Sequence, residues 1–115
     1  MTIAVDFDRT LIEDIEYPDN NYKLKKNAFE VINKLNNEYE IKFILNTQRY
    51  GWYFWSAVRF IRRNKLPIKI KLTLHKVKAD LYIDDKNINC KGIDWLEIEK
   101  AIIKEMNIYE NRKAT

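Results

Sequence analysis

Cysteine, glycine, proline and histidine are scarce in this 115-residue chain, which has one cysteine, two glycines, two prolines and one histidine. The single cysteine, Cys90, cannot form a disulfide within the chain, as is typical of proteins kept in a reducing cytosol. No apolar run is long enough to cross a bilayer, and the N-terminus lacks a basic segment followed by a hydrophobic stretch. These absences exclude an internal disulfide framework and a membrane span, and they predict a cytoplasmic protein.

Size and composition predict a single globular domain. No internal repeat, low-complexity tract or linker divides the sequence, and its hydrophobic (46%) and charged (33%) fractions are ordinary for a soluble protein. The net charge is +4 and the pI is about 9.1. Two interpretations of that charge stay open: contact with a nucleic-acid backbone, or simple solubility. We favour the second, because the positive charge is spread along the chain except between Arg59 and Lys71.

Apolar runs and helical spacings alternate along the sequence. Residues 2–7 are an apolar, β-favouring run typical of a strand buried on both faces. Asp94 and Glu97 predict a capping box at the start of the last helix. The order predicts an α/β fold: a Rossmann-like parallel sheet with helices on both faces. The predicted strands are 2–7, 41–45, 68–72 and 80–83; the helices are 24–35, 52–64 and 94–108, followed by a polar tail, 109–115, that frays.

Polar residues follow three of the predicted strands. Asp6 and Asp8 follow the first strand, Asn46 to Arg49 follow the second, and Asp84 and Asp85 follow the fourth. The carboxyl ends of parallel strands meet at one edge of a sheet, where ligands bind. Carboxylates that converge there repel one another unless a cation or a proton compensates them. Their hard oxygen atoms favour Mg²⁺, which also lets an anionic phosphoester approach.

The Asp6-x-Asp8 spacing adds a chemical role for each carboxylate. Residues i and i+2 of a strand point to the same side, so both side chains can reach one reacting centre. One carboxylate can attack phosphorus while the other passes a proton to the leaving oxygen. Paired aspartates can instead cap a turn or a helix, but the apolar surroundings of Asp6 disfavour this simpler interpretation, and the polar residues at the other strand ends disfavour it further.

These residues resemble the haloacid dehalogenase superfamily of phosphohydrolases. Val5 to Thr10 (VDFDRT) resembles its first motif, and Phe43 to Arg49 (FILNTQR) is similar to its second. Lys76 to Asp85 (KVKADLYIDD) resembles the combined third and fourth motifs of small members. The motifs occur in the family's order, and the short segments between them imply a member without a cap domain. The domain predicted from this resemblance covers residues 1–108.

The resemblance implies a magnesium-dependent phosphomonoester hydrolase that works through an aspartyl-phosphate. Asp6 would be the nucleophile and Asp8 the general acid and base, with Thr47 on the phosphoryl group and Lys76 neutralising charge. Lys78 is the alternative to Lys76. The metal ligands would be Asp6, Asp8 (through its backbone carbonyl), Asp84 and Asp85, and the substrate-binding residues would be Arg9, Thr10, Asn46 and Arg49.

Two residues depart from the family pattern. Arg9 stands where the family usually has glycine, and it would be strained if the backbone there needs a positive φ. An outward-pointing arginine would instead help to collect an anionic substrate. Asn46 stands where relatives often carry a bulky apolar residue, and nothing in the sequence explains it.

An aromatic and basic segment follows the second motif. Tyr50, Trp52, Tyr53 and Trp55 lie next to Arg59, Arg62 and Arg63 in the sequence. They predict either a nucleic-acid-binding rim, with bases stacked on the rings, or side chains that cover a neighbouring surface or form a dimer contact; we favour the latter. The alternative function is therefore an inactive or slow module that binds nucleic acid. A monomer and a homodimer, hydrolysis and phosphotransfer, and every class of phosphorylated substrate all stay open.

Overall fold

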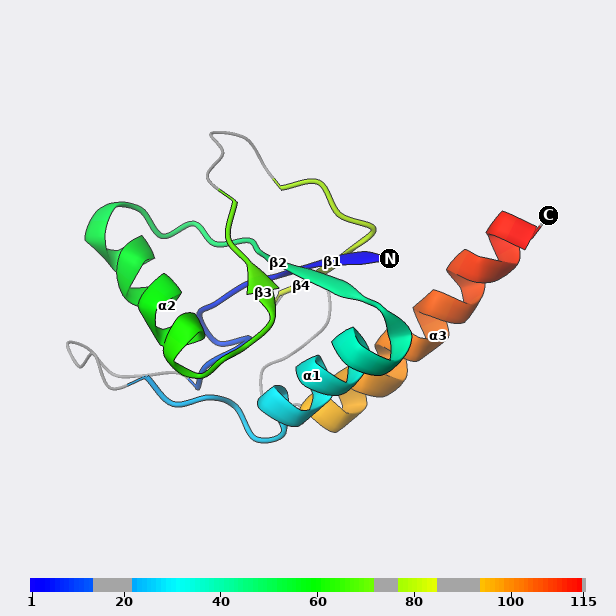
Figure 1. Cartoon of the computed structure of the whole chain (residues 1–115), viewed down its shortest axis with the longest axis horizontal. Helices are drawn as coiled ribbons and strands as arrows, with labels where there is room; N and C mark the ends of the chain where they lie inside the picture. Colours follow the sequence, from blue (N-terminus) through cyan, green and yellow to red (C-terminus); the bar gives the residue numbers. More distant parts are fainter. Residues whose placement is uncertain (14–21, 72–76, 85–93, 115) are drawn as a thin grey trace.

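A four-stranded parallel sheet forms the centre of the computed structural model, which describes residues 1–13, 22–71, 77–84 and 94–114. The strands lie in the order β3-β2-β1-β4, and each neighbouring pair is parallel. Figure 1 shows β1 running from the N-terminus toward the side of the molecule where α2 lies. The predicted α/β fold with a Rossmann-like parallel sheet is confirmed, and in the described residues its three helices contribute to one buried cluster and not to a separate one on each face. The strands are β1 (Thr2–Val5), β2 (Lys42–Leu45), β3 (Ile68–Lys69) and β4 (Leu81–Ile83).

One face of the sheet carries the main hydrophobic core. Ile3 pairs with Phe43, and Val5 pairs with both Leu45 and Ile83. Because successive side chains of a strand point to opposite faces, these large apolar side chains share one face. None of the five is more than 3% exposed, and all belong to the same buried cluster.

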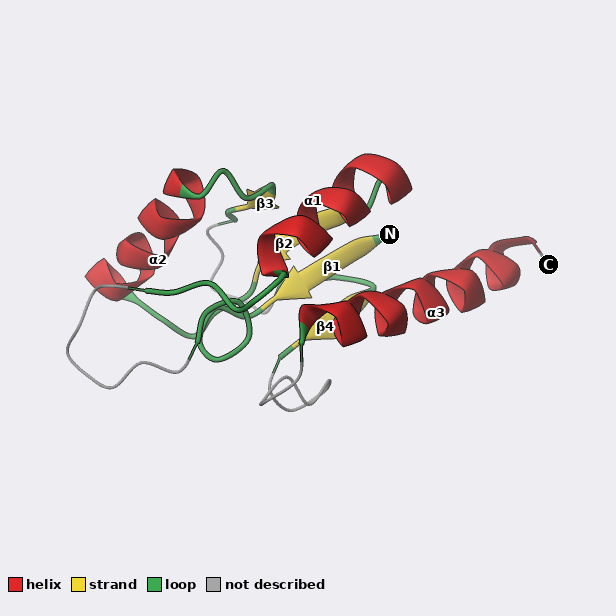
Figure 2. Cartoon of the chain, turned by 90° about the horizontal axis from the view of Figure 1, so that it is seen from below, coloured by secondary structure: helices red, strands yellow, loops and turns green. Residues whose placement is uncertain are grey.

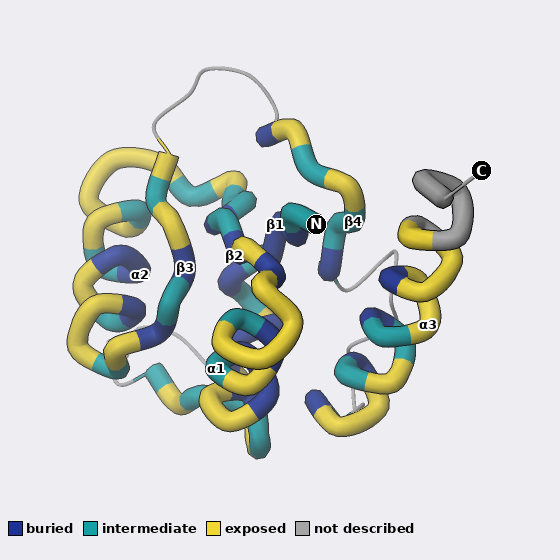
Figure 3. Tube along the Cα trace, turned by 45° about the vertical axis from the view of Figure 1, so that its right-hand side comes forward, coloured by how far each residue is buried: buried dark blue, intermediate teal, exposed yellow. Residues whose placement is uncertain are grey.

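Three helices contribute to that cluster: α1 (Ala28–Tyr39), α2 (Gly51–Arg63) and α3 (Trp95–Ala114). Figure 2 shows α1 and α3 on the same side of the sheet, and Figure 3 shows buried residues on the sides of α1 and α2 that face it. Within the described chain, no helix combines the length and apolar character needed to span a membrane. The buried helical residues are Ala28, Val31, Ile32, Leu35, Ala57, Val58, Ile61, Trp95, Ile98, Ile102 and Met106.

The opposite face of the sheet is less completely buried, since Ile44 and Tyr82, which both pair with Ala4, are partly exposed. Ala4 and Val77 are buried, but they lie outside the main cluster. Tyr82, which pairs with Ala4, donates its hydroxyl to the Val77 carbonyl and accepts a hydrogen bond from the Ala79 amide. In the described residues, the coil segment 77–80 therefore covers the middle of β4 on this face.

Several strands and helices begin or end at other residues than predicted. The first strand ends at Val5, because the Phe7 carbonyl accepts hydrogen bonds from the Leu11 and Ile12 amides and so begins a turn. The first helix begins at Ala28. The third strand holds only residues 68 and 69. Residues 109–114, predicted to fray, continue α3.

The predicted start of the first helix was wrong for a specific reason. Leu24 forms an antiparallel bridge with Ile12, and the Glu13 and Lys25 amides extend this pairing to the Lys23 and Leu11 carbonyls. These contacts pair residues 11–13 with residues 23–25, and we call the segments 11–13 and 22–25 the hairpin base. A helical spacing that included Leu24 could not distinguish this pairing from a first helical turn.

The starts of α1 and α3 are joined through their capping residues. Asn27, at the N-cap of α1, has a φ of 67° and donates its side-chain amide to both carboxylate oxygens of Asp94, at 2.9 and 3.2 Å. Asp94 also accepts a hydrogen bond from the Leu96 amide at 3.0 Å, which confirms a helix start at the predicted position. The hydrogen bond from Asn27 is the main reason that the pKa of Asp94 is lowered.

Asp94→Ala is expected to lower the melting temperature at pH 7, because the variant loses the acceptor for both Asn27 and Leu96. A lowered folded-state pKa means that this stabilisation is complete above the carboxyl's ordinary pKa and is lost as the pH falls through the folded value. Melts from pH 7 down to about pH 3 should therefore show the wild-type and variant temperatures converging in acid. Asn27→Ala should reproduce the pattern, and a pH-independent difference would contradict it.

Candidate functional site

The strand register places three polar residues side by side at the carboxyl edge of the sheet. The Asp6 amide donates to the Ile83 carbonyl at 3.0 Å, and the Asn46 amide donates to the Val5 carbonyl at 2.8 Å. Both ladders therefore continue one residue past β1, which puts Asp6 between Asn46 and Asp84. All three residues are half-buried. The predicted convergence of the three strand ends is thus observed.

The Asp6 carboxylate is oriented by its own turn. Its Oδ1 accepts a hydrogen bond from the Phe7 amide at 2.8 Å. Because the Asp6 amide is also held by the β1–β4 ladder, backbone contacts on both sides fix the residue at the point where the chain leaves the sheet. A carboxylate held in this way loses little orientational freedom when a substrate binds.

Asp8 is held by Arg49, which follows the second strand. The Arg49 Nε lies 2.8 Å from Asp8 Oδ2, and Nη2 lies 2.6 Å from Oδ1. This parallel pair of charge-assisted bonds uses both oxygens of the carboxylate. The Arg49 side chain is 15% exposed and that of Asp8 is 45% exposed, so the pair closes off one side of the site while Asp8 stays open to solvent.

Arg49 is also held on its other sides. Its Nη1 donates to the Tyr22 hydroxyl at 2.7 Å and to the Tyr53 carbonyl at 3.2 Å. The guanidinium carbon lies 4.8 Å from the centre of the Phe7 ring and 5.0 Å from that of the Tyr22 ring, within cation–π range. The hydrogen bond to Asp8 is the main reason that the pKa of Arg49 is raised, and the side chain stays charged throughout the working pH range.

The two rings that contact this arginine belong to a cluster of three aromatic side chains. Phe7, Tyr22 and Phe60 contact each other edge to face, with ring centres 5.2 to 5.9 Å apart. The Tyr22 hydroxyl also lies 2.9 Å from the Ser56 hydroxyl. The turn after β1, the hairpin base and α2 are thus joined through one aromatic cluster, and Arg49 lies above it.

Thr47 has its hydroxyl oriented by the backbone. Its Oγ1 accepts a hydrogen bond from the Arg49 amide at 3.2 Å, and the residue is half-buried. A hydroxyl that accepts one bond can still donate its proton, so Thr47 can give a hydrogen bond to an oxygen of an incoming anion. The role expected for it requires such a donor.

The turn after Asp8 departs from regular backbone. Arg9 has a φ of 61°, in the left-handed region that favours glycine, and its side chain is exposed. Thr10 is fully buried, and its carbonyl accepts a hydrogen bond from Trp95 Nε1 at 3.0 Å. Its hydroxyl finds no partner among the described residues. Thr10 therefore acts in building the turn, and the prediction that it contacts substrate is not supported by its burial.

Of the two candidate lysines, only Lys78 lies within the described residues. Lys76 and Asp85, both predicted site residues, lie outside the described residues. Lys78 is exposed and lies between Val77 and Ala79, both of which contact the Tyr82 hydroxyl beside the middle of β4. This position is on the face of the sheet and not at its carboxyl edge, so the assignment of the charge-neutralising lysine to Lys76 stays a prediction.

The donor set at this edge suits Mg²⁺ in its usual protein chemistry. Mg²⁺ typically takes one or two carboxylates and completes its shell with water and substrate phosphate oxygens. Asp6 and Asp84 supply two such carboxylates from neighbouring strands, whereas both side-chain oxygens of Asp8 are engaged by Arg49. Within the described ranges, no group of three or more histidine, cysteine, aspartate and glutamate side chains is arranged to hold a metal.

Sequence reasoning missed two residues that shape this site. Tyr22 was assigned to no element, yet it contacts Arg49 through both its hydroxyl and its ring. Trp95 fell within the predicted last helix without any role at the site, yet its indole holds the turn after Asp8. A buried tryptophan usually needs a partner for its N–H, and this need is the signal in the sequence that indicates such a contact.

Comparison with known proteins gives a structural relative. No family model matches the chain, and no curated protein matches it. A solved structure of a conserved protein from Bacteroides thetaiotaomicron is similar over 91% of this chain and 91% of its own, with 33% sequence identity and a TM-score of 0.71.

Arg9→Gly is expected to raise the free energy of unfolding by about 0.5–1 kcal/mol. Glycine relieves about 1–2 kcal/mol of left-handed strain, and its freer unfolded chain offsets about 0.4–1 kcal/mol of that gain. The β-branched variant Arg9→Val should destabilise the protein. Urea unfolding measures both effects, and Lys65→Gly, at an exposed position with a φ of 52°, is the matched control. If Lys65→Gly stabilises and Arg9→Gly does not, contacts of Arg9 outweigh its strain.

Proposed function

The chain belongs to the same family as the conserved Bacteroides thetaiotaomicron protein, and from the site on its sheet edge we propose that it is a magnesium-dependent phosphomonoester hydrolase of the haloacid dehalogenase type. The observation that carries this proposal is the placement of Asp6 between Asn46 and Asp84, with Asp8 two residues on. Half-buried carboxylates gathered at the carboxyl ends of parallel strands form an anionic site that suits a cation and a phosphate.

Asp6 is the nucleophile in this proposal. One of its oxygens attacks the phosphorus of a phosphomonoester, the bond from phosphorus to the ester oxygen breaks, and an aspartyl-phosphate remains on the chain. Water then attacks this phosphorus, which releases inorganic phosphate and restores the Asp6 carboxylate. The hydrogen bond from the Phe7 amide holds one oxygen of Asp6 in place and so orients the carboxylate.

Asp8 moves the proton in both steps. In its protonated form it gives a proton to the departing ester oxygen, and it then takes a proton from the attacking water. Both of its oxygens are bonded to Arg49 in the structure, so one bond has to open before that oxygen can carry a proton. A phosphate group offers the guanidinium an equally good two-oxygen partner, and its arrival would free Asp8.

The remaining residues bind and orient the phosphoryl group. Thr47 donates a hydrogen bond from its hydroxyl to a phosphoryl oxygen. Asn46, beside Asp6, can donate another from its side-chain amide. Asp6 and Asp84 would hold Mg²⁺, which when bound supplies positive charge that offsets the negative charge of the phosphate and the carboxylates. Lys76 is proposed to add positive charge on the same anion.

Asp6→Asn is expected to reduce phosphate release from an aryl phosphate ester by about 10³-fold or more, because the amide cannot form the acyl-phosphate. Release by the wild type should need Mg²⁺ and stop with chelator. The matched control is Glu105→Gln, which removes one negative charge at an exposed position of α3. Circular dichroism and thermal melts verify folding, and activity retained in the asparagine variant would refute the nucleophile.

Arg49→Lys tests the link between Arg49 and Asp8. Lysine keeps the charge but cannot hold both carboxylate oxygens, so activity should fall by about 10- to 100-fold. If Arg49 transfers to the phosphate, KM should rise together with a fall in kcat. A fall in kcat at constant KM would show that Arg49 only positions Asp8, and unchanged kinetics would remove it from the mechanism.

A nucleic-acid-binding module without turnover is the second candidate. The full engagement of Asp8 by Arg49 favours it, because a carboxylate with both oxygens bonded is not ready for proton transfer. Failure of the wild type to release phosphate from any ester, together with binding of nucleic acid in chelator, would support this candidate over the hydrolase.

A further inference from the structure

The outward side of α2 carries exposed aromatic rings and arginines that the proposed chemistry does not use. Tyr50 is 84% exposed, Trp52 is 67% exposed, and Trp55 is 50% exposed. Within the described chain these rings therefore stay largely exposed, and the expected contact with a second copy stays a prediction. The arginines Arg59, Arg62 and Arg63 are exposed as well.

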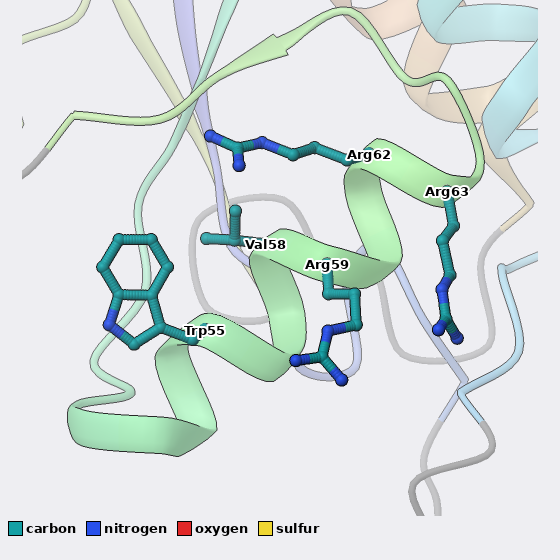
Figure 4. A pocket seen from close by; sticks show the side chains of 5 residues that line it. All are labelled: Trp55, Val58, Arg59, Arg62 and Arg63. Atoms are coloured by element: carbon teal, nitrogen blue, oxygen red, sulfur yellow. The ribbon is translucent and has the colours of Figure 1, made fainter.

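One tryptophan, Trp55, and the three arginines line an open groove of about 560 Å³ (Figure 4), whereas Tyr50 and Trp52 lie outside its lining. Val58, which is 2% exposed, forms its floor. Trp55 and Arg62 extend to one side of the helix, and Arg59 and Arg63 extend to another. The ion pairs among the described residues include none of these three arginines, each of which brings a positive charge to the groove.

The tryptophan at the groove is held in place by its neighbour. Phe54, which packs against the core, contacts Trp55 edge to face with ring centres 5.3 Å apart. A ring held in this way loses little side-chain entropy when a second flat group stacks on it. Guanidinium groups beside such a ring can pair with phosphate oxygens through two parallel hydrogen bonds.

The groove is connected to the sheet edge through α2. The helix begins four residues after Thr47, and Arg49 bonds the Tyr53 carbonyl in its first turn. Its 13 residues span about 20 Å, so the helix can lead an extended chain away from the site. Exposed rings near its start and arginines near its end then follow one another along the same ligand.

We propose that the α2 groove binds single-stranded nucleic acid and that the substrate of the site is the terminal phosphate of such a strand. Stacking needs unpaired bases, and arginines track the phosphate backbone, so this surface fits a single strand in both respects. An acidic peptide would satisfy the arginines but would leave the exposed rings unused. The proposal that the groove binds a single strand does not depend on the hydrolase function. The proposal that the terminal phosphate is the substrate rests on that proposed function.

Binding is tested first, with the full chain, chelator and a fluorescent single-stranded 12-mer that has no terminal phosphate. Trp55→Ala should weaken affinity by about 5-fold or more, since stacking on one ring contributes substantially to binding. Arg62→Ala should weaken it and also flatten its dependence on salt concentration. Lys104→Ala, which removes a positive charge from an exposed position on α3, is the matched control and should bind as the wild type does. Thermal melts verify that each variant folds.

Turnover is tested next, by comparing an oligonucleotide that carries a 5′- or 3′-phosphate with the matching nucleoside monophosphate. The ratio of their kcat/KM values should be about 10 or more in the wild type and should fall toward one in Trp55→Ala. Failure to bind the 12-mer, or equal binding of an acidic peptide, would overturn the groove assignment. Binding with equal turnover of both substrates would overturn the substrate assignment alone. Binding with no turnover of any ester would overturn the hydrolase and leave the groove in place.

Discussion

The contact between Arg49 and Asp8 is the interaction on which the candidate site depends. A guanidinium that is only 15% exposed would be costly to desolvate without a partner, and the carboxylate supplies one through two hydrogen bonds. The same arginine reaches Tyr22 in the hairpin base and the Tyr53 carbonyl in α2. Three segments that are distant in the sequence are therefore held around one charge, and the aromatic cluster beneath it fixes their spacing.

This arrangement also explains why the exposed parts of the site lie where they do. Asp6 is fixed from the sheet side by the β1–β4 ladder, and Asp8 is fixed from the α2 side by Arg49. Asp6 is half-buried, the Asp8 side chain is 45% exposed, and the exposed rings begin at Tyr50, the residue after Arg49. A phosphate carried on a long chain could reach the carboxylates while the rest of the chain lies along the helix.

The parallel sheet and the edge at which its polar residues gather could be predicted because they follow from local patterns. The runs before Asp6 and Asn46 are apolar and end abruptly in polar residues, and parallel pairing then brings those ends together without further information. The partner of Arg49 could not be found in this way. Asp8 lies 41 residues earlier in the chain, and no spacing rule joins the two. The predicted first helix wrongly included Leu24 for a related reason: one apolar residue fits a helical stripe and a strand pairing equally well.

The indole of Trp95 ties the beginning of the chain to its last helix. In the turn that follows Asp8, the Thr10 carbonyl accepts a hydrogen bond from Trp95, which lies 85 positions later in the chain. During synthesis, the first strand and its two aspartates therefore leave the ribosome long before the group that completes their turn. The nascent chain can pair β1 with β2 and pack α1 early, but the candidate site acquires its final support only when α3 emerges. Assembly of the site is thus a late event of folding, coupled to completion of the core.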